Sequence, residues 1–88
     1  MADWSLAFSK SASGDLVRLG LAVQRRIMGK LDRLARHFDD ITPESLTGEF
    51  ADFFKLRVGD WRVFYRVAWD TRVIMIHNVV HRSKAYKG

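Results

Sequence analysis

Apolar and polar residues alternate along residues 54 to 67, and this alternation is the strongest local pattern in the chain. It predicts two strands joined at Gly59-Asp60, which is a favoured two-residue hairpin loop. Because side chains of a strand alternate between faces, one face of the hairpin is apolar and the other is cationic. The apolar face has Phe54, Leu56, Val58, Trp61, Val63, Tyr65 and Val67, and the cationic face has Lys55, Arg57, Arg62 and Arg66 beside Phe64.

This hairpin register brings two arginines together. The predicted partners are Val58 with Trp61, Arg57 with Arg62, Leu56 with Val63, Lys55 with Phe64, and Phe54 with Tyr65. Opposed like charges repel by roughly 0.2 to 1 kcal/mol, which a bound polyanion would relieve. Guanidinium groups also match phosphate oxygens with paired hydrogen bonds, so the two arginines suit a phosphate clamp. The alternative is an ordinary solvated sheet face, and the hairpin alone favours neither interpretation.

The residues before the hairpin predict one strand, two helices and a loop. Alternating apolar residues predict a strand over residues 2 to 8. Ser9 or Ser11 would cap a short helix that stops at Gly20. A longer helix over residues 21 to 38 has a stripe of apolar residues at helical spacing, and a solvated face is the favoured interpretation of its many arginines. The stripe consists of Val23, Ile27, Leu31, Leu34 and Phe38. Residues 39 to 50, with Pro43 and Gly48, predict a loop or short turn.

The residues after the hairpin predict one further strand. Asp70-Thr71 indicates a turn, and residues 73 to 80 are apolar on both faces, which is typical of an interior strand. His77 lies inside this run and is interpreted as a core histidine. If the turn has two residues, His81 falls on the same sheet face as Lys55 and Arg62. The predicted fold is therefore α+β, with a strand, a two-helix hairpin and three to four strands, and the helices packed on one face of a twisted antiparallel sheet.

Length and composition limit what the chain can be. Its 88 residues predict a single domain, 1–88, with a modest core and a shallow, open site. There is no cysteine for disulfides or thiolate chemistry, and no apolar run of membrane-spanning length. The first residues lack the basic and apolar regions of a signal peptide, so we expect a cytoplasmic protein that does not enter a membrane.

The positive charge is concentrated in the C-terminal third. Residues 1 to 54 have seven Lys/Arg against eight Asp/Glu, a net charge of −1. Residues 55 to 88 have eight Lys/Arg against two Asp, a net charge of +6. A localised excess of this kind is typical of a protein that binds nucleic acid or an acidic partner.

Two motifs give the chain a family resemblance. The first is Leu-Arg-x-Gly-x-aromatic-Arg within residues 55 to 63, followed by Tyr65-Arg66-Val67. The second is His81-Arg82 followed by Tyr86. With the opening strand at Trp4, the helical hairpin and residues 46 to 48, the chain resembles the RelE/ParE superfamily of type II toxin–antitoxin toxins, and within it the RelE-type mRNA interferases.

The resemblance implies a metal-independent endoribonuclease without a cofactor, which cleaves messenger RNA in the ribosomal A site. In this reaction the 2′-hydroxyl attacks the adjacent phosphate, which requires a base, an acid and cations around the phosphorane. The implied catalytic residues are Lys55, Arg57, Arg62, His81, Arg82 and Tyr86, and the implied substrate-binding residues are Phe53, Phe64, Arg66 and Lys84. The implied partners are ribosome-bound messenger RNA and a cognate antitoxin, in a toxin–antitoxin complex that we expect to be oligomeric.

Several roles stay open at this stage. Histidine is the residue type best suited to proton transfer near neutrality, which makes His81 a candidate base, but His81 could equally make a structural hydrogen bond. Tyr86 could stack on a base, assist proton transfer or pack on the sheet. Phe53 stands where some relatives have a lysine, and the chain ends two residues after Tyr86 without a longer helix. The alternative functions are a ParE-like, non-catalytic inhibitor of DNA gyrase and a nuclease-dead relative that binds antitoxin or RNA; the closing motif favours the nuclease.

Overall fold

The N-terminal half of the chain forms a strand followed by two helices, as its apolar pattern predicts. The computed structural model describes residues 4–85. Strand β1 covers Ser5–Phe8, helix α1 covers Lys10–Val17 and helix α2 covers Leu21–Arg36. The predicted stripe of α2 is buried, except for the half-buried Val23 at its start. The stripe continues past the helix into Phe38, which lies in the short 3₁₀ turn η1, Phe38–Asp40.

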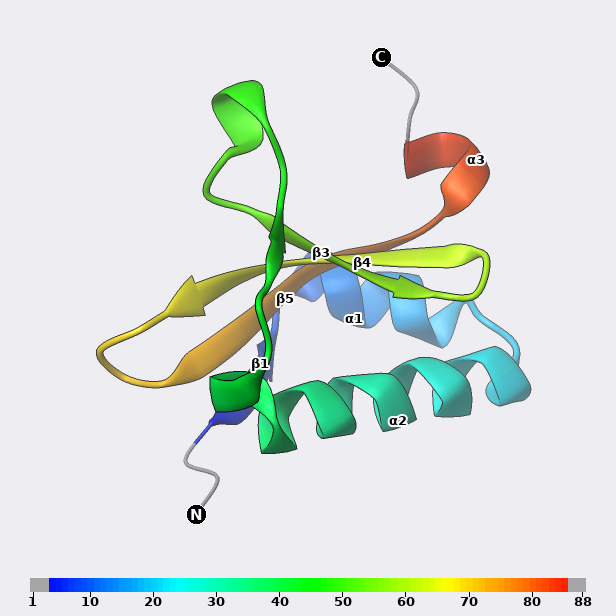
Figure 1. Ribbon diagram of the computed structural model, residues 1–88. Helices are drawn as coiled ribbons and strands as arrows, with labels where there is room; N and C mark the ends of the chain where they lie inside the picture. The colour runs from blue at the N-terminus through cyan, green and yellow to red at the C-terminus, as the bar shows by residue number, and fades with distance from the viewer. Residues whose placement is uncertain (1–3, 86–88) are drawn as a thin grey trace.

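The C-terminal half forms the rest of a five-stranded sheet with the order β1-β5-β4-β3-β2 (Figure 1). Its elements are β2 at Glu44–Ser45, the 3₁₀ turn η2 at Gly48–Phe50, β3 at Phe54–Val58, β4 at Trp61–Ala68, β5 at Val73–His81 and α3 at Arg82–Ala85. The prediction of a loop over residues 39 to 50 was wrong where β2 forms. A two-residue strand is too short to show alternation, so its pairing with β3 is invisible in the sequence.

The sheet is mixed, whereas the sequence predicted an antiparallel one. β1 pairs in parallel with β5, and the other neighbouring strands are antiparallel. A parallel pair needs a long connection, and here everything from α1 to β4 separates the two strands. Alternation along β1 indicates a strand with one buried face but carries no information about the direction of its partner.

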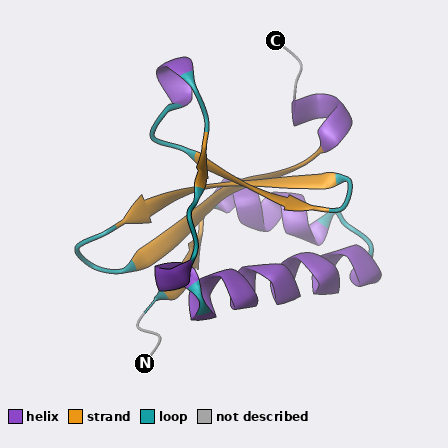
Figure 2. Cartoon of the chain, in the orientation of Figure 1, coloured by secondary structure: helices purple, strands orange, loops and turns teal. Residues whose placement is uncertain are grey.

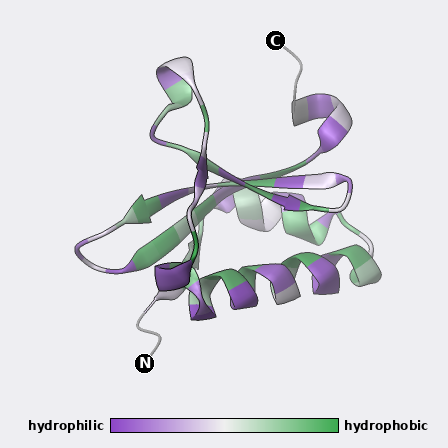
Figure 3. Cartoon of the chain, viewed as in Figure 1, coloured by the Kyte–Doolittle hydropathy of each residue, from purple (hydrophilic) through white to green (hydrophobic). Residues whose placement is uncertain are grey.

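Both long helices lie on one face of the sheet, which leaves the other face without a helical layer among residues 4–85 (Figure 2). The apolar side of α2 faces the sheet and its polar side faces outward (Figure 3). Ile27 and Leu31 of α2 are fully buried in a core shared with Val63, Ile74 and Ile76 of the sheet. We call the side of the sheet opposite to α1 and α2 the open face.

The β3–β4 hairpin has the predicted register. Arg57 lies opposite Arg62, Lys55 opposite Phe64, and Val58 opposite Trp61. Gly59 has φ of 58°, a left-handed conformation that glycine adopts without strain, and this explains its place in the two-residue turn. The predicted apolar residues of the hairpin all belong to, or pack against, the buried core.

A β-bulge changes the register halfway along β4 and β5. From the turn inward, Ala68 pairs with Val73 and Tyr65 with Ile76, but the next pair is Phe64 with Asn78. One residue of β5, His77, is therefore left without a partner at the bulge. Beyond this point every β5 side chain lies on the opposite face from the one expected for an uninterrupted ladder.

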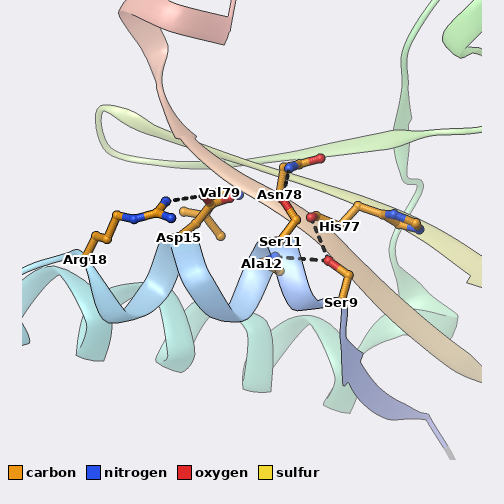
Figure 4. A network of polar contacts seen from close by, with 8 residues as sticks. All are labelled: Ser9, Ser11, Ala12, Asp15, Arg18, His77, Asn78 and Val79. Carbon is orange, nitrogen blue, oxygen red and sulfur yellow. Dashed lines mark hydrogen bonds and ion pairs between the residues drawn. The ribbon is translucent and has the colours of Figure 1, made fainter.

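Helix α1 covers the edge of β5 where β1 ends (Figure 4). The Ser9 hydroxyl caps α1 by accepting from the backbone N–H of Ala12 (3.0 Å) and donates to the carbonyl of His77 (2.9 Å). Asp15 accepts from the backbone N–H of Val79 at 2.9 Å. Polar side chains thus replace a strand at this edge, which would otherwise present unpaired backbone groups.

The predicted stop of α1 at Gly20 was wrong. The helix ends at Val17, and Gly20 is instead the N-cap of α2. The amide of Gln24 donates to the carbonyls of Leu16 and Leu19 at 2.6 and 3.3 Å, so a side chain from the next helix satisfies the end of α1.

Across residues 4–85, no helix combines the length and the apolar character that a bilayer span requires.

Replacing Ser9 by alanine tests the double role of its hydroxyl. We expect Ser9→Ala to lower the free energy of unfolding by about 1–3 kcal/mol, because it removes a helix cap and a hydrogen bond to β5. Urea denaturation measures the change. Ser13→Ala, on the exposed side of the same helix, is the matched control and should change stability by less than about 0.5 kcal/mol. Equal effects of the two substitutions would contradict the assignment.

Candidate functional site

The predicted cations of the hairpin lie on the open face of the sheet. Their hairpin neighbours Val58, Val63 and Tyr65 are buried against the helices, so alternation directs the cationic residues to the opposite side. Lys55 and Arg57 come from β3, and Arg62 and Arg66 come from β4, with Phe64 half-buried between the two arginines of β4. This part of the sequence prediction is confirmed.

Glu44 on β2 holds two of these cations around one oxygen. Its Oε2 atom lies 3.3 Å from Nζ of Lys55 and 3.3 Å from Nη2 of Arg57. The hydrogen bond from Lys55, followed by the positive charge of Arg57, lowers the pKa of Glu44 below its ordinary value. The Lys55 side chain is 13% exposed, whereas that of Arg57 is 59% exposed. A single carboxylate oxygen is therefore held between two cations of β3.

Arg62 has a structural role that the sequence did not indicate. It is only 8% exposed, and its Nη1 atom donates to the carbonyls of Gly59 and Trp61, both at 3.0 Å. These bonds fasten the hairpin turn from the open face. The predicted Arg57–Arg62 pair exists, but the repulsion is relieved internally, since Arg57 binds Glu44 and Arg62 binds backbone carbonyls.

His81 does not lie on the face of Lys55 and Arg62, so that prediction was wrong. The bulge pairs His81 with Trp61, and the two rings meet edge to face with centroids 5.2 Å apart. Nδ1 of His81 accepts from the backbone N–H of Ser83 at 3.3 Å and lies 2.9 Å from the hydroxyl oxygen of the same serine.

His81 lines an open groove of about 390 Å³ at the helix-covered side of the sheet. The groove residues include Asp15, Arg18 and Leu19 of α1, Trp61, and Lys84 of α3. Lys84, a predicted substrate-binding residue, is exposed there and is thus grouped with His81 rather than with the hairpin cations. Tyr86 lies outside the residues that the structure describes.

Arg82 is held beside the hairpin turn. The backbone N–H of Arg82 donates to the carbonyl of Asp60 at 2.8 Å, and Nε of Arg82 lies 3.6 Å from Oδ1 of Asp60. The first residue of α3 is thereby fixed to the hairpin turn, the same turn whose carbonyls accept hydrogen bonds from Arg62.

His77 is not a core histidine as predicted. It is half-buried at the bulge, its ring points away from α1 (Figure 4), and it meets the ring of Phe53 edge to face at 5.1 Å. The guanidinium of Arg66 lies over Phe53, 5.4 Å from the ring centroid. Burial lowers the pKa of His77, and the charge of Arg66 lowers it further. Two of the predicted substrate-binding residues, Phe53 and Arg66, therefore meet at the edge of the cationic hairpin.

Sequence reasoning missed Glu44 and the placement of His77. Glu44 follows the only proline in a segment without periodicity, and its two partners are more than ten positions away. His77 was assigned to the core because apolar residues surround it, but alternation with the buried Ile76 directs it to the open face. Among residues 4–85 no three His, Asp or Glu side chains gather to hold a metal ion.

Comparison with known proteins identifies the family of the chain. A family model described as the ParE toxin of the type II toxin–antitoxin system parDE matches residues 6–86. The chain belongs to the RelE/ParE superfamily of toxins. A protein of Methanocaldococcus jannaschii named as a candidate toxin, RelE1, is 42% identical over 36 residues, which are 41% of this chain and 40% of that protein. The match thus spans about two fifths of the curated relative.

Solved structures of RelE toxins extend the likeness over the whole fold of this superfamily member. The RelBE2 toxin–antitoxin complex of Mycobacterium tuberculosis contains a chain with 25% identity and a TM-score of 0.80, covering 91% of this chain and 99% of the other. The RelE–RelB complex of Pyrococcus horikoshii gives 27% identity and a TM-score of 0.72, with coverage of 93% and 98%. A mutant E. coli RelE in the free state gives 26% identity and a TM-score of 0.73, covering 98% of this chain and 88% of the other.

The environment of His77 predicts a measurable titration. Followed by NMR, His77 should titrate below the ordinary histidine pKa of about 6.5, and Arg66→Gln should raise its pKa by removing a nearby positive charge. Lys84→Gln, on the other side of the sheet, is the control and should leave the value unchanged.

The same shift gives a sign for stability. The pKa of His77 is lower in the folded than in the unfolded chain, so its stabilising contribution is present above about pH 6.5 and is lost as the pH falls through the folded-state pKa. An acid-side loss of stability that is smaller in Arg66→Gln than in the wild type would agree with this. A His77 pKa above 6.5 would contradict it.

Proposed function

We propose that this type II toxin is a ribosome-dependent endoribonuclease that cleaves messenger RNA through attack of the 2′-hydroxyl on the adjacent phosphate. The observation that carries the proposal is the Glu44 oxygen bridged by Lys55 and Arg57 on an open sheet face. Two cations that converge on one anionic oxygen are suited to stabilise a phosphorane, whose charge exceeds that of the ground-state diester. On substrate binding, a phosphate oxygen would replace the carboxylate between them.

Each residue of the proposed site has a separate task. Arg57, exposed and bound only through Glu44 in the contacts described above, would contact the reacting phosphate with its planar fork of donors. Lys55 would supply a second positive charge at the same oxygen. Arg62 and Arg82 would hold the hairpin turn and the start of α3 in register while adding positive charge near the substrate.

Proton transfer is assigned to Lys55 or Tyr86 rather than to His81. His81 pairs with Trp61 on the helix-covered side, away from the oxygen held by Lys55 and Arg57. Its bond from Ser83 suits a residue that positions α3, and hence Arg82, relative to the sheet. His81→Ala would then reduce cleavage through misplacement of α3.

The proposed partners are ribosome-bound messenger RNA and a cognate antitoxin. Two of the similar solved structures are complexes of RelE with RelB, and acidic residues of a comparable antitoxin would suit the cationic open face. An oligomeric toxin–antitoxin complex and a cytoplasmic location are part of the proposal.

Substituting Arg57 tests the chemistry without unfolding the hairpin. Arg57→Gln should lower the single-turnover rate of cleavage of ribosome-bound message by about 10² to 10³-fold, because a donor to the transition-state charge is lost. Arg57→Lys should fall between it and the wild type, since an ammonium keeps the charge but not the fork. Urea denaturation of each variant verifies that it folds. Arg62 is less suitable for this test, because it is buried and bonded to the hairpin turn, so its substitution would also affect folding.

The matched control for Arg57 is Arg25→Lys on the exposed surface of α2, which should cleave at the wild-type rate. Equal rates for Arg57→Gln and the wild type at saturating ribosome would refute the role of Arg57. Intact message during toxin-induced growth arrest would refute the nuclease itself.

A second candidate function follows from the matched family, which is named for ParE. A ParE-like toxin would inhibit DNA gyrase by binding, with no chemistry of its own. If the nuclease proposal is right, the purified protein leaves gyrase supercoiling unaffected at concentrations that cleave message. Inhibition of supercoiling that persists in Arg57→Gln would reverse the order of the two candidates.

A further inference from the structure

An aromatic cluster adjoins the cationic residues on the open face. Phe53 is its centre, with the guanidinium of Arg66 over the ring at 5.4 Å and the edge of His77 at 5.1 Å. Phe50 of η2 meets Phe53 at 6.3 Å and is 53% exposed. Neither the hairpin nor the helical core requires these contacts, since Phe53 precedes β3 and Phe50 is largely exposed.

The cluster continues the rows of the cationic site. Phe53 lies two residues before Lys55, and Arg66 lies two residues after Phe64, which pairs with Lys55. Residues two apart on neighbouring strands occupy adjacent positions of one sheet face. An aromatic position with a cation over it therefore lies one step from the oxygen held between Lys55 and Arg57.

We propose that Phe53, Arg66 and His77 form a stacking subsite for a nucleobase of single-stranded RNA whose neighbouring phosphate lies at Lys55 and Arg57. The proposal rests on the proposed function and adds the way in which the strand is held. Arg66 is exposed, and its planar guanidinium, supported from beneath by Phe53, offers a surface on which a base can stack. Any base has such a face, so the subsite would tolerate different sequences.

Charge favours RNA over a protein segment as the occupant. The open face has Lys55, Arg57, Arg62 and Arg66, and Glu44 is an acidic partner of Lys55 and Arg57. Alternating cations and aromatic rings are the arrangement by which proteins follow a single strand, with phosphates at the cations and bases on the rings. An acidic protein segment would use the cations but would leave the rings without a stacking partner.

The test measures binding of a short, uncleavable 2′-O-methyl RNA rather than cleavage. Phe53→Leu keeps an apolar side chain but removes the ring, and should weaken binding by roughly 5- to 100-fold. An RNA with one base removed should bind the wild type more weakly by a similar factor, at one position only. The same abasic RNA should bind Phe53→Leu no more weakly than intact RNA does, because the interaction is already lost.

Controls separate stacking from loss of structure. Trp69→Leu removes an exposed aromatic ring that packs on Trp4 and Phe38, and should leave RNA binding unchanged. Phe53→Tyr keeps the ring and should retain wild-type affinity. If Phe53→Leu unfolds at a lower urea concentration than the wild type, Arg66→Gln replaces it in the comparison of abasic and intact RNA.

Several results would overturn the inference. If the effects of Phe53→Leu and of base removal are additive at every position of the RNA, no base stacks on Phe53. Failure of the wild type to bind the RNA would also overturn the inference. Unchanged RNA binding with weakened antitoxin binding in Phe53→Leu would make the cluster a protein contact. Stacking without cleavage of ribosome-bound message would instead refute the nuclease and leave the subsite standing.

Discussion

The bulge between β4 and β5 decides which side chains can act together. On a sheet covered by helices on one face only, every strand residue is either in the core or on the open face, and a shift of one residue exchanges the two sets. The shift occurs at His77. The half of β5 nearest the β4–β5 turn therefore keeps Ile74 and Ile76 in the core, whereas His81 pairs with Trp61 on the helix-covered face. His77, next to the buried Ile76, stays on the open face by ordinary alternation, and the bulge removes His81 from that face.

Local patterns predicted what depends on local geometry. The hairpin register, the apolar stripe of α2 and the cationic side of β3 and β4 follow from alternation, turn chemistry and helical spacing, and all three are present. The errors have a different origin. The bulge, the parallel pairing of β1 and the contact of Glu44 with β3 depend on residues far apart in the chain, for which periodicity carries no signal.

Contacts within the chain hold the cations of the open face close together. Lys55 and Arg57 share a carboxylate oxygen, Arg62 is held by two carbonyls, and Arg66 lies over an aromatic ring. Each positive group thus has a partner that partly neutralises it, which is the condition for holding like charges on neighbouring strands. Apart from the Glu44 carboxylate these partners are uncharged dipoles and rings, so a polyanion could compete with them for the cations.

Preorganisation follows from the same contacts. A cation that is already desolvated and hydrogen-bonded reorganises little when charge develops on a substrate, and this is where electrostatic stabilisation of a transition state is largest. Lys55, with its side chain mostly buried, and Arg62, fixed to the hairpin turn, meet this condition, whereas Arg57 and Arg66 remain exposed and adjustable. Under the proposed function, Lys55 would stay in place at the phosphate while the exposed Arg57 and Arg66 adjust to the strand.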